Sequence, residues 1–255
     1  MTDLFSYREL IRNLVLKDLK LKYRDSTLGF LWSLANPLLL ILVYSFVFTH
    51  MLRVGIPDFP FFLMVGILPW NFFAQSMMMS TGSILDNGSL IKKISLPMEV
   101  LPVATVVFNL VQYLLVLAVF VPISVLFFRI PLSWSMLGFF PVLALQLLFT
   151  LGVSFLVSAA TVFYRDVRHF TEILLTLLFW MTPIVYEVQA ISESVRRVVY
   201  LNPLSFYTIA YQEVFYHRVF PSPKELLVLT ALSLLMLAFG YSLFSHYRVR
   251  FAEEV

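Results

Sequence analysis

Long stretches without a charged residue are the feature that most constrains how this chain folds. Residues 30–52 and 61–85 contain no Asp, Glu, Lys or Arg, and residues 100–164 contain only Arg129. A helix needs about 20 mainly apolar residues to cross a lipid bilayer. Charged residues make up 13% of the chain, whereas soluble globular proteins carry about 25%. The sequence therefore predicts an integral membrane protein.

The same stretches predict an all-α polytopic fold with about six transmembrane helices in one domain over residues 1–255. The 100–164 stretch is too long for a single span at about 1.5 Å per residue, and Arg129 and Pro131 mark a turn inside it. We therefore divide it into two spans. The predicted spans are 30–52, 61–85, 100–127, 133–163, 170–186 and 226–247.

Residues 187–224 contain an apolar run, 198–212, that Asn202 and Pro203 interrupt. Proline breaks the helical hydrogen-bond ladder and disfavours helix at the residue before it. The run favours two short half-helices that enter the membrane from one side, since irregular backbone is tolerated there when protein or water surrounds it. The alternative is a seventh span, which would place the two termini on opposite sides.

Basic residues predict the orientation of the spans. Twelve Lys and Arg residues fall on the side of the termini and six on the other side. Because cytoplasmic loops carry the excess of Lys and Arg, both termini are expected in the cytoplasm of a multi-pass protein of the cytoplasmic membrane. In residues 5–25 apolar and basic residues alternate at roughly helical spacing. This pattern predicts an amphipathic helix in the cytoplasmic interface.

The sequence contains none of the motifs that would let this chain power transport. It has no cysteine, which excludes disulfides, iron–sulfur clusters and thiolate zinc sites. No glycine opens a phosphate-binding G-x-x-x-x-G-K-[ST] loop, and its histidines form no H-x-x-x-H pair. The span interiors hold almost none of the acidic residues typical of ion-coupled carriers. Uphill transport would therefore need energy from a partner.

The loop of residues 86–97 is the segment that suits such a partner. A capping residue opens it, Pro97 ends it, and the residues between form a short amphipathic helix with an apolar face and two lysines. A short amphipathic helix of this kind can dock into a groove of another protein. The alternative is a capped loop whose lysines only enforce orientation. The candidate docking residues are Asn87, Leu90, Ile91, Lys92, Lys93 and Ile94.

Several short motifs occur in an order that resembles the ABC-2 type polysaccharide exporters, and within them the O-antigen permeases of the Wzm type. They are KDLKLKYRDSTLGFLWSLANPLLLILVYSFVF from Lys17, FLMVGILPWNFF from Phe62, NGSLIKKISLPMEVLP from Asn87, LGVSFLVSAATVFYRDVRHF from Leu151, MTPIVY from Met181 and LNP from Leu201. In the 181–186 motif, Thr182 stands where relatives often have serine.

The resemblance implies a homodimer that works with two copies of a separate ATPase, which binds ATP and Mg²⁺. The exported substrate would be a lipid-linked O-antigen-type polysaccharide, and nucleic acid is not an expected partner. Capsular polysaccharide, teichoic acid, or a small lipid or drug are the alternative substrates within the superfamily. A different class, an intramembrane enzyme on lipid-linked sugars, would need clustered acids or histidines in the spans, and the sequence offers none.

The resemblance also implies roles for particular segments. The turn at Leu28 and Gly29 would lie where the substrate enters, residues 86–97 would form the coupling helix, and residues 187–224 with Asn202 and Pro203 would form a periplasmic gate. Spans one and five would line the channel, where flat aromatic rings can hold sugars weakly at many positions. The alternative is that these rings are packing or interface aromatics. The candidates are Trp32, Tyr44, Phe46, Phe48, Phe179, Trp180 and Tyr186.

Basic residues near the N-terminus are the last set of candidates. Arg8, Arg12, Lys17 and Lys20 would suit the diphosphate of a lipid-linked substrate. Attraction to anionic lipid, at about 1 kcal/mol per basic residue, explains the same residues without a substrate.

Overall fold

A computed structural model describes residues 4–24, 31–93, 96–127 and 133–254, and all the regular structure among them is helical. The elements are η1 (Leu4–Tyr7), α1 (Arg8–Tyr23), α2 (Leu31–Phe46), η2 (Val47–Met51), α3 (Phe59–Gly82), η3 (Leu85–Asn87), α4 (Gly88–Lys93), α5 (Val100–Phe127), η4 (Trp134–Gly138), α6 (Phe139–Phe163), α7 (Val167–Met181), α8 (Glu193–Val199), α9 (Pro203–Gln212), η5 (Glu213–His217) and α10 (Pro223–Glu254). The predicted all-α class is confirmed.

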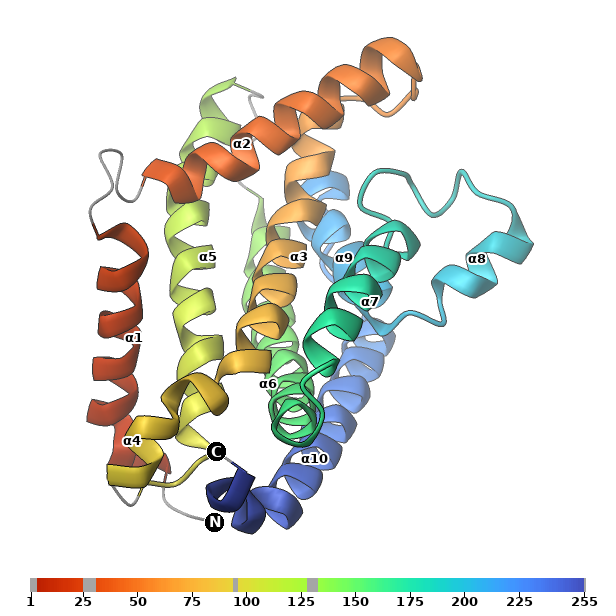
Figure 1. The fold of residues 1–255 in the computed structure, drawn as a ribbon. Helices are drawn as coiled ribbons and strands as arrows, with labels where there is room; N and C mark the ends of the chain where they lie inside the picture. The colour runs from red at the N-terminus through yellow and green to blue at the C-terminus, as the bar shows by residue number, and fades with distance from the viewer. Residues whose placement is uncertain (1–3, 25–30, 94–95, 128–132, 255) are drawn as a thin grey trace.

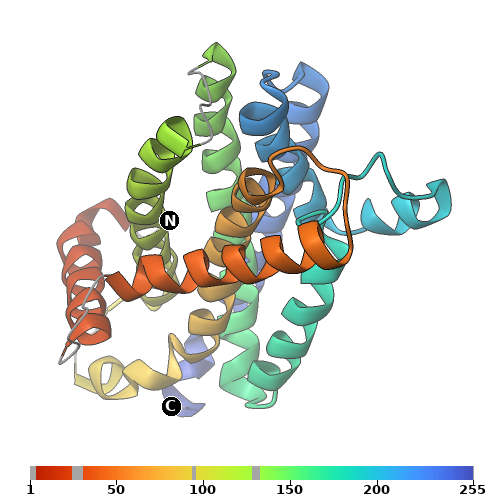
Figure 2. The same ribbon diagram turned by 90° about the horizontal axis from the view of Figure 1, so that it is seen from above.

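The long helices form a bundle in which α3, α5, α6 and α10 run side by side (Figure 1). The start of η1 and the end of α10 lie at the same end of the bundle as α4. This arrangement agrees with an even number of crossings and not with a seventh span. Seen from above, α2 passes across one side of the bundle and α8 projects away from it (Figure 2).

Five helical stretches of the described residues are long and apolar enough to cross a membrane. They are Leu34–Met51, Phe59–Gly82, Val100–Leu126, Trp134–Phe163 and Pro223–Phe251. Each coincides with a predicted span, within a few residues in most cases. The predicted span 170–186 is different, because its helix, α7, covers only the 15 residues Val167–Met181.

Helix α7 ends where Thr182 adopts an extended backbone ahead of Pro183. The chain then leaves the bundle, forms α8, and returns to begin α9 close to the end of α7. Helix α9 is inserted among α3, α6 and α10, whereas Val199 is the buried residue of α8. Helices α8 and α9 lie within 187–224, and only α9 enters the bundle. That this segment forms half-helices entering a membrane from one side stays a prediction.

Small residues bring α6 and α10 unusually close together. A Cβ atom added to Gly152 of α6 would lie 2.5 Å from the backbone of Met236, and one added to Gly240 of α10 would collide with the Gly152 carbonyl. Ser80 of α3 and Ser154 of α6 share a hydrogen bond of 2.6 Å. Helices pack in membranes through such small residues and buried hydroxyls, because lipid supplies no hydrophobic force between them.

Helix α10 is longer than the predicted span 226–247 at both ends. Ser222 and Glu225 form a capping box around Pro223, with the Ser222 N–H donating to Glu225 at 2.6 Å and the Glu225 N–H to Ser222 at 3.3 Å. At the far end Phe251 is buried and packs with Phe244. These contacts explain why the helix continues beyond its apolar span.

Helix α1 confirms the helix predicted within residues 5–25 and stands beside the first half of α5 (Figure 1). Leu14 packs against Val100, Leu101 and Ala104 of α5, and these four side chains are buried. One face of α1 is therefore covered by the bundle. Its location in the cytoplasmic interface stays a prediction.

Candidate functional site

The short helix α4 is held onto the bundle by its apolar face. Leu90 and Ile91 pack on the cluster formed by Leu14 of α1 and Leu101 of α5. The exposed side chains of the loop include Asp86, Ser89 and Lys92. Leu90 and Ile91 therefore position α4, and the polar side chains offer the surface that a partner would meet. Ile94 and the Lys93 side chain lie outside the described residues.

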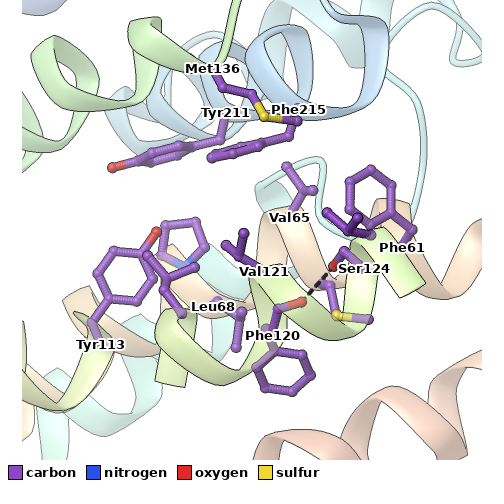
Figure 3. A pocket seen from close by; sticks show the side chains of 14 residues that line it. Phe61, Val65, Leu68, Tyr113, Phe120, Val121, Ser124, Met136, Tyr211 and Phe215 are labelled. Atoms are coloured by element: carbon purple, nitrogen blue, oxygen red, sulfur yellow. Dashed lines mark hydrogen bonds between the residues drawn. The ribbon is translucent and has the colours of Figure 1, made fainter. Parts of the chain in front are cut away.

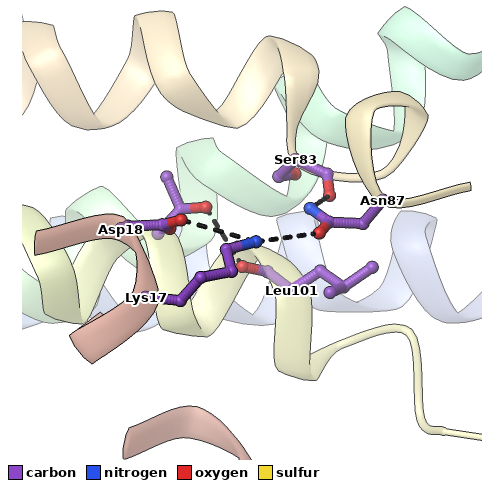
Figure 4. A network of polar contacts seen from close by, with 6 residues as sticks. Lys17, Asp18, Ser83, Asn87 and Leu101 are labelled. Atoms are coloured by element: carbon purple, nitrogen blue, oxygen red, sulfur yellow. Dashed lines mark hydrogen bonds and ion pairs between the residues drawn. The ribbon is translucent and has the colours of Figure 1, made fainter. Parts of the chain in front are cut away.

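Polar contacts tie this loop to α1 (Figure 4). The Lys17 ammonium lies 3.5 Å from Asp18 Oδ1 and donates at 3.5 Å to Asn87 Oδ1. The Asn87 side-chain amide donates in turn to the Ser83 carbonyl at 2.9 Å, at the end of α3. Lys17, a predicted substrate residue, and Asn87, a predicted docking residue, are thus in direct contact.

The C-terminal end of α10 holds the other side of the same loop. Arg248 forms an ion pair with Glu99, which is almost fully buried just before α5 begins. Ile84, just before η3, belongs to the buried cluster that contains Phe251. The described residues that flank α4 are therefore held by α1 and α10, Asn87 by Lys17 and both Ile84 and Glu99 by the end of α10.

The other basic residues of α1 differ in their surroundings. Arg8 and Lys20 are exposed, and Arg12 makes an exposed ion pair of 3.6 Å with Glu9. Lys22, which the sequence analysis did not single out, donates to Gln112 Oε1 of α5 at 3.2 Å and lies 5.7 Å from the centre of the Phe108 ring. Lys22 is also exposed as a whole residue, but desolvation of its ammonium beside α5 lowers its pKa below the usual value.

Lys22 stands at the edge of a groove of about 680 Å³ between α1, α2, α3 and α5. Carboxamide side chains from three helices line much of it. Its polar residues besides Lys22 are Asn36, Asn71, Gln75, Asn109 and Gln112, and Trp32 is at its rim. The predicted turn at Leu28 and Gly29 lies outside the described residues.

The aromatic residues predicted to line a channel fall into two groups. Tyr44, Phe48 and Phe179 are partly buried and pack on the main core, with the ring centres of Tyr44 and Phe179 6.2 Å apart. Trp32, Phe46 and Trp180 expose 53%, 58% and 55% of their surface. The partly buried Tyr186 donates its hydroxyl to the Trp180 carbonyl at 3.2 Å. The exposed group has the larger ring surface open to contact, and its role as a channel lining stays a prediction.

Asn202 and Pro203 lie at the junction of α7 and α9. The Asn202 side-chain amide donates to Thr182 Oγ1 at 2.8 Å, while its Oδ1 caps α9 by accepting from the Leu204 N–H at 3.0 Å. Gln212 of α9 donates to the Pro183 carbonyl at 2.6 Å. Backbone groups exposed by the break in the helix are thereby satisfied within the protein, as a membrane requires.

A smaller apolar cavity of about 60 Å³ lies between α3, α5, η4 and α9 (Figure 3). Phe61, Val65, Met136 and Phe215 point toward it. Beside it, the Tyr211 hydroxyl donates to Gln146 Oε1 at 2.7 Å, and the Gln146 amide donates to the Pro69 carbonyl at 3.0 Å. The cavity is too small for a sugar, and this polar chain joins α9, α6 and α3.

Comparison with known proteins decides between the classes of membrane protein considered above. The sequence profile of the ABC-2 type transporter family matches residues 9–216. The chain belongs to the ABC-2 type transporter family. Members of this family are the membrane-spanning subunits of transporters that work with a nucleotide-binding ATPase.

Individual members of the ABC-2 family are similar over nearly the full chain. The O-antigen export system permease protein RfbA of Myxococcus xanthus is 37% identical over 255 residues, 99% of this chain and 98% of that protein. A protein of the same name from Klebsiella pneumoniae is 34% identical over 239 residues, 93% and 91% of the two chains. The polysialic acid transport protein KpsM of Escherichia coli is 23% identical over 76% of each chain.

In this ABC-2 subunit, sequence reasoning missed residues whose partners lie far away in the chain. Lys22 meets Gln112, and Glu99 meets Arg248. The carboxamides of the groove could have been found from the sequence, because Asn and Gln within apolar spans are costly to leave facing lipid. Among the described residues, no three His, Asp or Glu side chains are placed to hold one metal ion.

Proposed function

We propose that this chain is the channel-forming permease subunit of an ATP-driven exporter that moves lipid-linked O-antigen-type polysaccharide across the cytoplasmic membrane. The observation that carries the proposal is the similarity to O-antigen export permeases over 99% of the chain at 37% identity. A likeness that extends over every helix supports a shared architecture and a shared class of cargo.

The working unit would be a homodimer with two copies of a separate ATPase that binds ATP and Mg²⁺. The start of η1, the end of α10 and α4 lie at one end of the bundle, and the excess of Lys and Arg on that side supports a cytoplasmic location for it. Asp86, Ser89 and Lys92 would face the ATPase there. Leu90 and Ile91, which pack inward, would transmit its movement to α1 and α5.

The exposed faces of α2 and α7 suit the wall of a channel shared by two copies. Leu42 and Phe46 of α2 and Ile173 and Trp180 of α7 are all more than half exposed. Trp32, Phe46 and Trp180 offer flat apolar rings to the faces of sugars. Asn202 and Pro203 would set the position of α9 in a gate at the opposite end from α4.

Deletion of the gene in its host tests the proposal. Lipid-linked polymer should accumulate inside the cell and surface O-antigen should disappear, and the intact gene should restore both. Normal surface polysaccharide in the deletion strain would overturn the assignment of cargo. The purified chain with its ATPase should hydrolyse ATP, while the chain alone should not.

Capsular polysaccharide is the second candidate cargo, because KpsM is similar over 76% of the chain. The same deletion strain separates the two cargoes. Loss of capsule with normal O-antigen would favour the second, and loss of O-antigen with normal capsule the first.

A further inference from the structure

The groove between α1, α2, α3 and α5 has the size of a ligand site. Its volume of about 680 Å³ lies within the range of about 300–1,000 Å³ found for pockets that bind small molecules. It is separate from the exposed aromatic residues of α7 and from the docking surface of α4. The proposed function gives no role to its carboxamide residues, and of these Gln112 contacts Lys22.

Carboxamides give this groove its chemistry. Asn71 and Gln75 of α3 and Asn109 and Gln112 of α5 each carry hydrogen-bond donors and an acceptor. Asn109 is 2% exposed and its amide donates to the Thr105 carbonyl at 2.9 Å, yet its Oδ1 has no hydrogen-bond partner among the described residues. A buried acceptor of this kind costs about 1–3 kcal/mol when it is left unpaired, so the site favours a ligand with hydroxyl or amide donors.

Lys22 provides a positive charge at the same groove. It approaches from α1 and donates to Gln112 at 3.2 Å, so its ammonium is directed at the carboxamides. An ammonium has three donors, which leaves capacity for an anionic oxygen beside Gln112. Hydrogen bonds between an ammonium and a phosphate are shorter and stronger than neutral ones.

A second groove, on another side of α5, has the apolar lining expected of a site for acyl chains. It therefore serves as a comparison for the polar groove. It has a similar volume, about 700 Å³, and lies between α5, η4 and α6. Leu117, Val121, Trp134 and Phe140 line it, and Ser133 is its polar member. The contrast between two sides of one helix indicates that the carboxamides serve a hydrogen-bonding ligand and not the lipid tails.

We propose that the polar groove binds the sugar–phosphate end of a lipid-linked glycan, with Lys22 on the phosphate and Asn71, Gln75 and Asn109 on the first sugar. Trp32, which is half exposed at the rim, would cover the apolar face of that sugar. Leu39 and Leu40 of α2 line the same groove and would contact the start of the lipid. This inference rests on the proposed function, since it names where the cargo of that exporter is held.

Equilibrium binding to the full-length chain in nanodiscs of phosphatidylcholine tests the proposal. The probes are a polyprenyl diphosphate bearing one N-acetylhexosamine, the same polyprenyl diphosphate without sugar, and phosphatidylglycerol. Lys22→Gln should weaken the binding of both polyprenyl diphosphate probes about tenfold, because it removes roughly one charge-assisted hydrogen bond. The control, Lys224→Gln, changes an exposed lysine at the start of α10 that does not line the groove, and it should bind like wild type.

Asn71→Leu should weaken the binding of only the sugar-bearing probe. Asn71→Gln should restore part of the lost affinity. If Asn71→Leu does not fold, Gln75→Leu replaces it, because Gln75 is exposed in the groove. Equal binding of phosphatidylglycerol and the glycolipid would show a general headgroup site and overturn the proposal. Wild-type binding by both Lys22→Gln and the leucine variants would overturn it as well.

The cellular readout separates this proposal from the function on which it rests. If the deletion strain loses O-antigen but Lys22→Gln and Asn71→Leu restore it fully, the exporter stands and the groove assignment fails. If the deletion strain keeps its O-antigen, the proposed function itself fails. Export that falls in both variants while Lys224→Gln remains normal supports the two proposals together.

Discussion

Two sides of the bundle differ in how their helices are held. On one side α6 and α10 touch through Gly152 and Gly240 so closely that neither glycine has room for a side chain. On the other side α2 and α7 leave large apolar side chains such as Leu42 and Ile173 about two-thirds exposed. The contact between α6 and α10 leaves no room for the two helices to move. The exposed apolar face of α2 and α7 suits contact with lipid, polymer or a second copy. A transporter needs both, a rigid frame and a wall that moves against it.

The close contact between α6 and α10 gives the largest predicted effect. Gly152→Leu should prevent most of the chain from folding, because the new side chain would meet the Met236 backbone, which cannot move aside cheaply. Overpacking of this kind costs about 1–3 kcal/mol or more. The measure is the yield of monodisperse protein in detergent and its melting temperature.

Gly55→Leu is the matched control, because nothing lies within 4 Å of a Cβ atom added to Gly55 in the α2–α3 connection. It should leave yield and melting temperature close to wild type. Equal behaviour of the two variants would contradict the distinction between a tight and a loose side.

The junction of α7 and α9 gives the next effect. Asn202→Ala removes the bond to Thr182 and the cap of α9, and should destabilise the protein by about 2–3 kcal/mol, the sum of a buried hydrogen bond and a helix cap. Thr182→Ser keeps the hydroxyl and should cost only about 1 kcal/mol, the loss of one buried methyl group. Ser192→Ala at the start of α8, where no side-chain cap bond exists, is the control. Thermal unfolding in detergent measures all three, and an unchanged melting temperature in Asn202→Ala would count against the junction.

How far the sequence predicts this fold depends on the range of the interaction. The spans 30–52, 61–85, 100–127, 133–163 and 226–247 follow from local apolar runs, because a bilayer imposes the length of each helix. The end of α7 at Met181 does not follow in this way. Pro183 gives a local signal for the break, because proline disfavours helix at the residue before it, but the predicted span ran past it. The break is also stabilised by Asn202, which is 20 residues away in the chain.

The candidate site also divides into features that the local sequence predicts and contacts that only the fold reveals. Amphipathic spacing correctly indicates that α4 has an apolar face, but it does not say whether that face meets the bundle or a partner, and Leu90 and Ile91 meet the bundle. Counting basic residues finds the positive charge of α1, yet only the fold shows that Lys22 meets Gln112, 90 residues along the chain. Aromatic content likewise does not separate the packed Phe179 from the exposed Trp180.

Phe179 and Trp180 are neighbours on α7 that allow the same comparison, between a packed and an exposed side chain, within one helix. Trp180→Ala should leave stability within about 0.5 kcal/mol of wild type, because surface changes rarely exceed that, and should reduce export if the exposed ring meets the polymer. Phe179→Ala removes a ring packed against Tyr44 and Trp70, and should destabilise the protein by about 2 kcal/mol or more. Melting temperature and surface O-antigen are measured together. The reverse order of the two stabilities would show that the wall is not where we place it.

The smallest predicted effect lies in η5, which joins α9 to the connection before α10 and packs on η4 and α3. Burial, followed by the charge of Glu225 and a hydrogen bond with it, raises the pKa of Glu213 to about 7. Because this pKa is above the value of about 4.3 for an unfolded glutamate, the fold favours the protonated carboxyl. The stability that Glu213 contributes is therefore complete below about pH 4.3 and is lost as the pH rises through 7.

Glu213→Gln keeps a hydrogen-bonding group of the same shape and removes the titration. Between pH 6 and 8 the wild-type melting temperature should fall by more than that of the variant, and at pH 8 the variant should be the more stable of the two. Glu193→Gln in α8, where the carboxylate makes an exposed ion pair with Arg197, is the control and should follow the wild-type curve. Parallel curves for wild type and Glu213→Gln would mean that the carboxyl is solvated and that η5 is packed less closely than its contacts indicate.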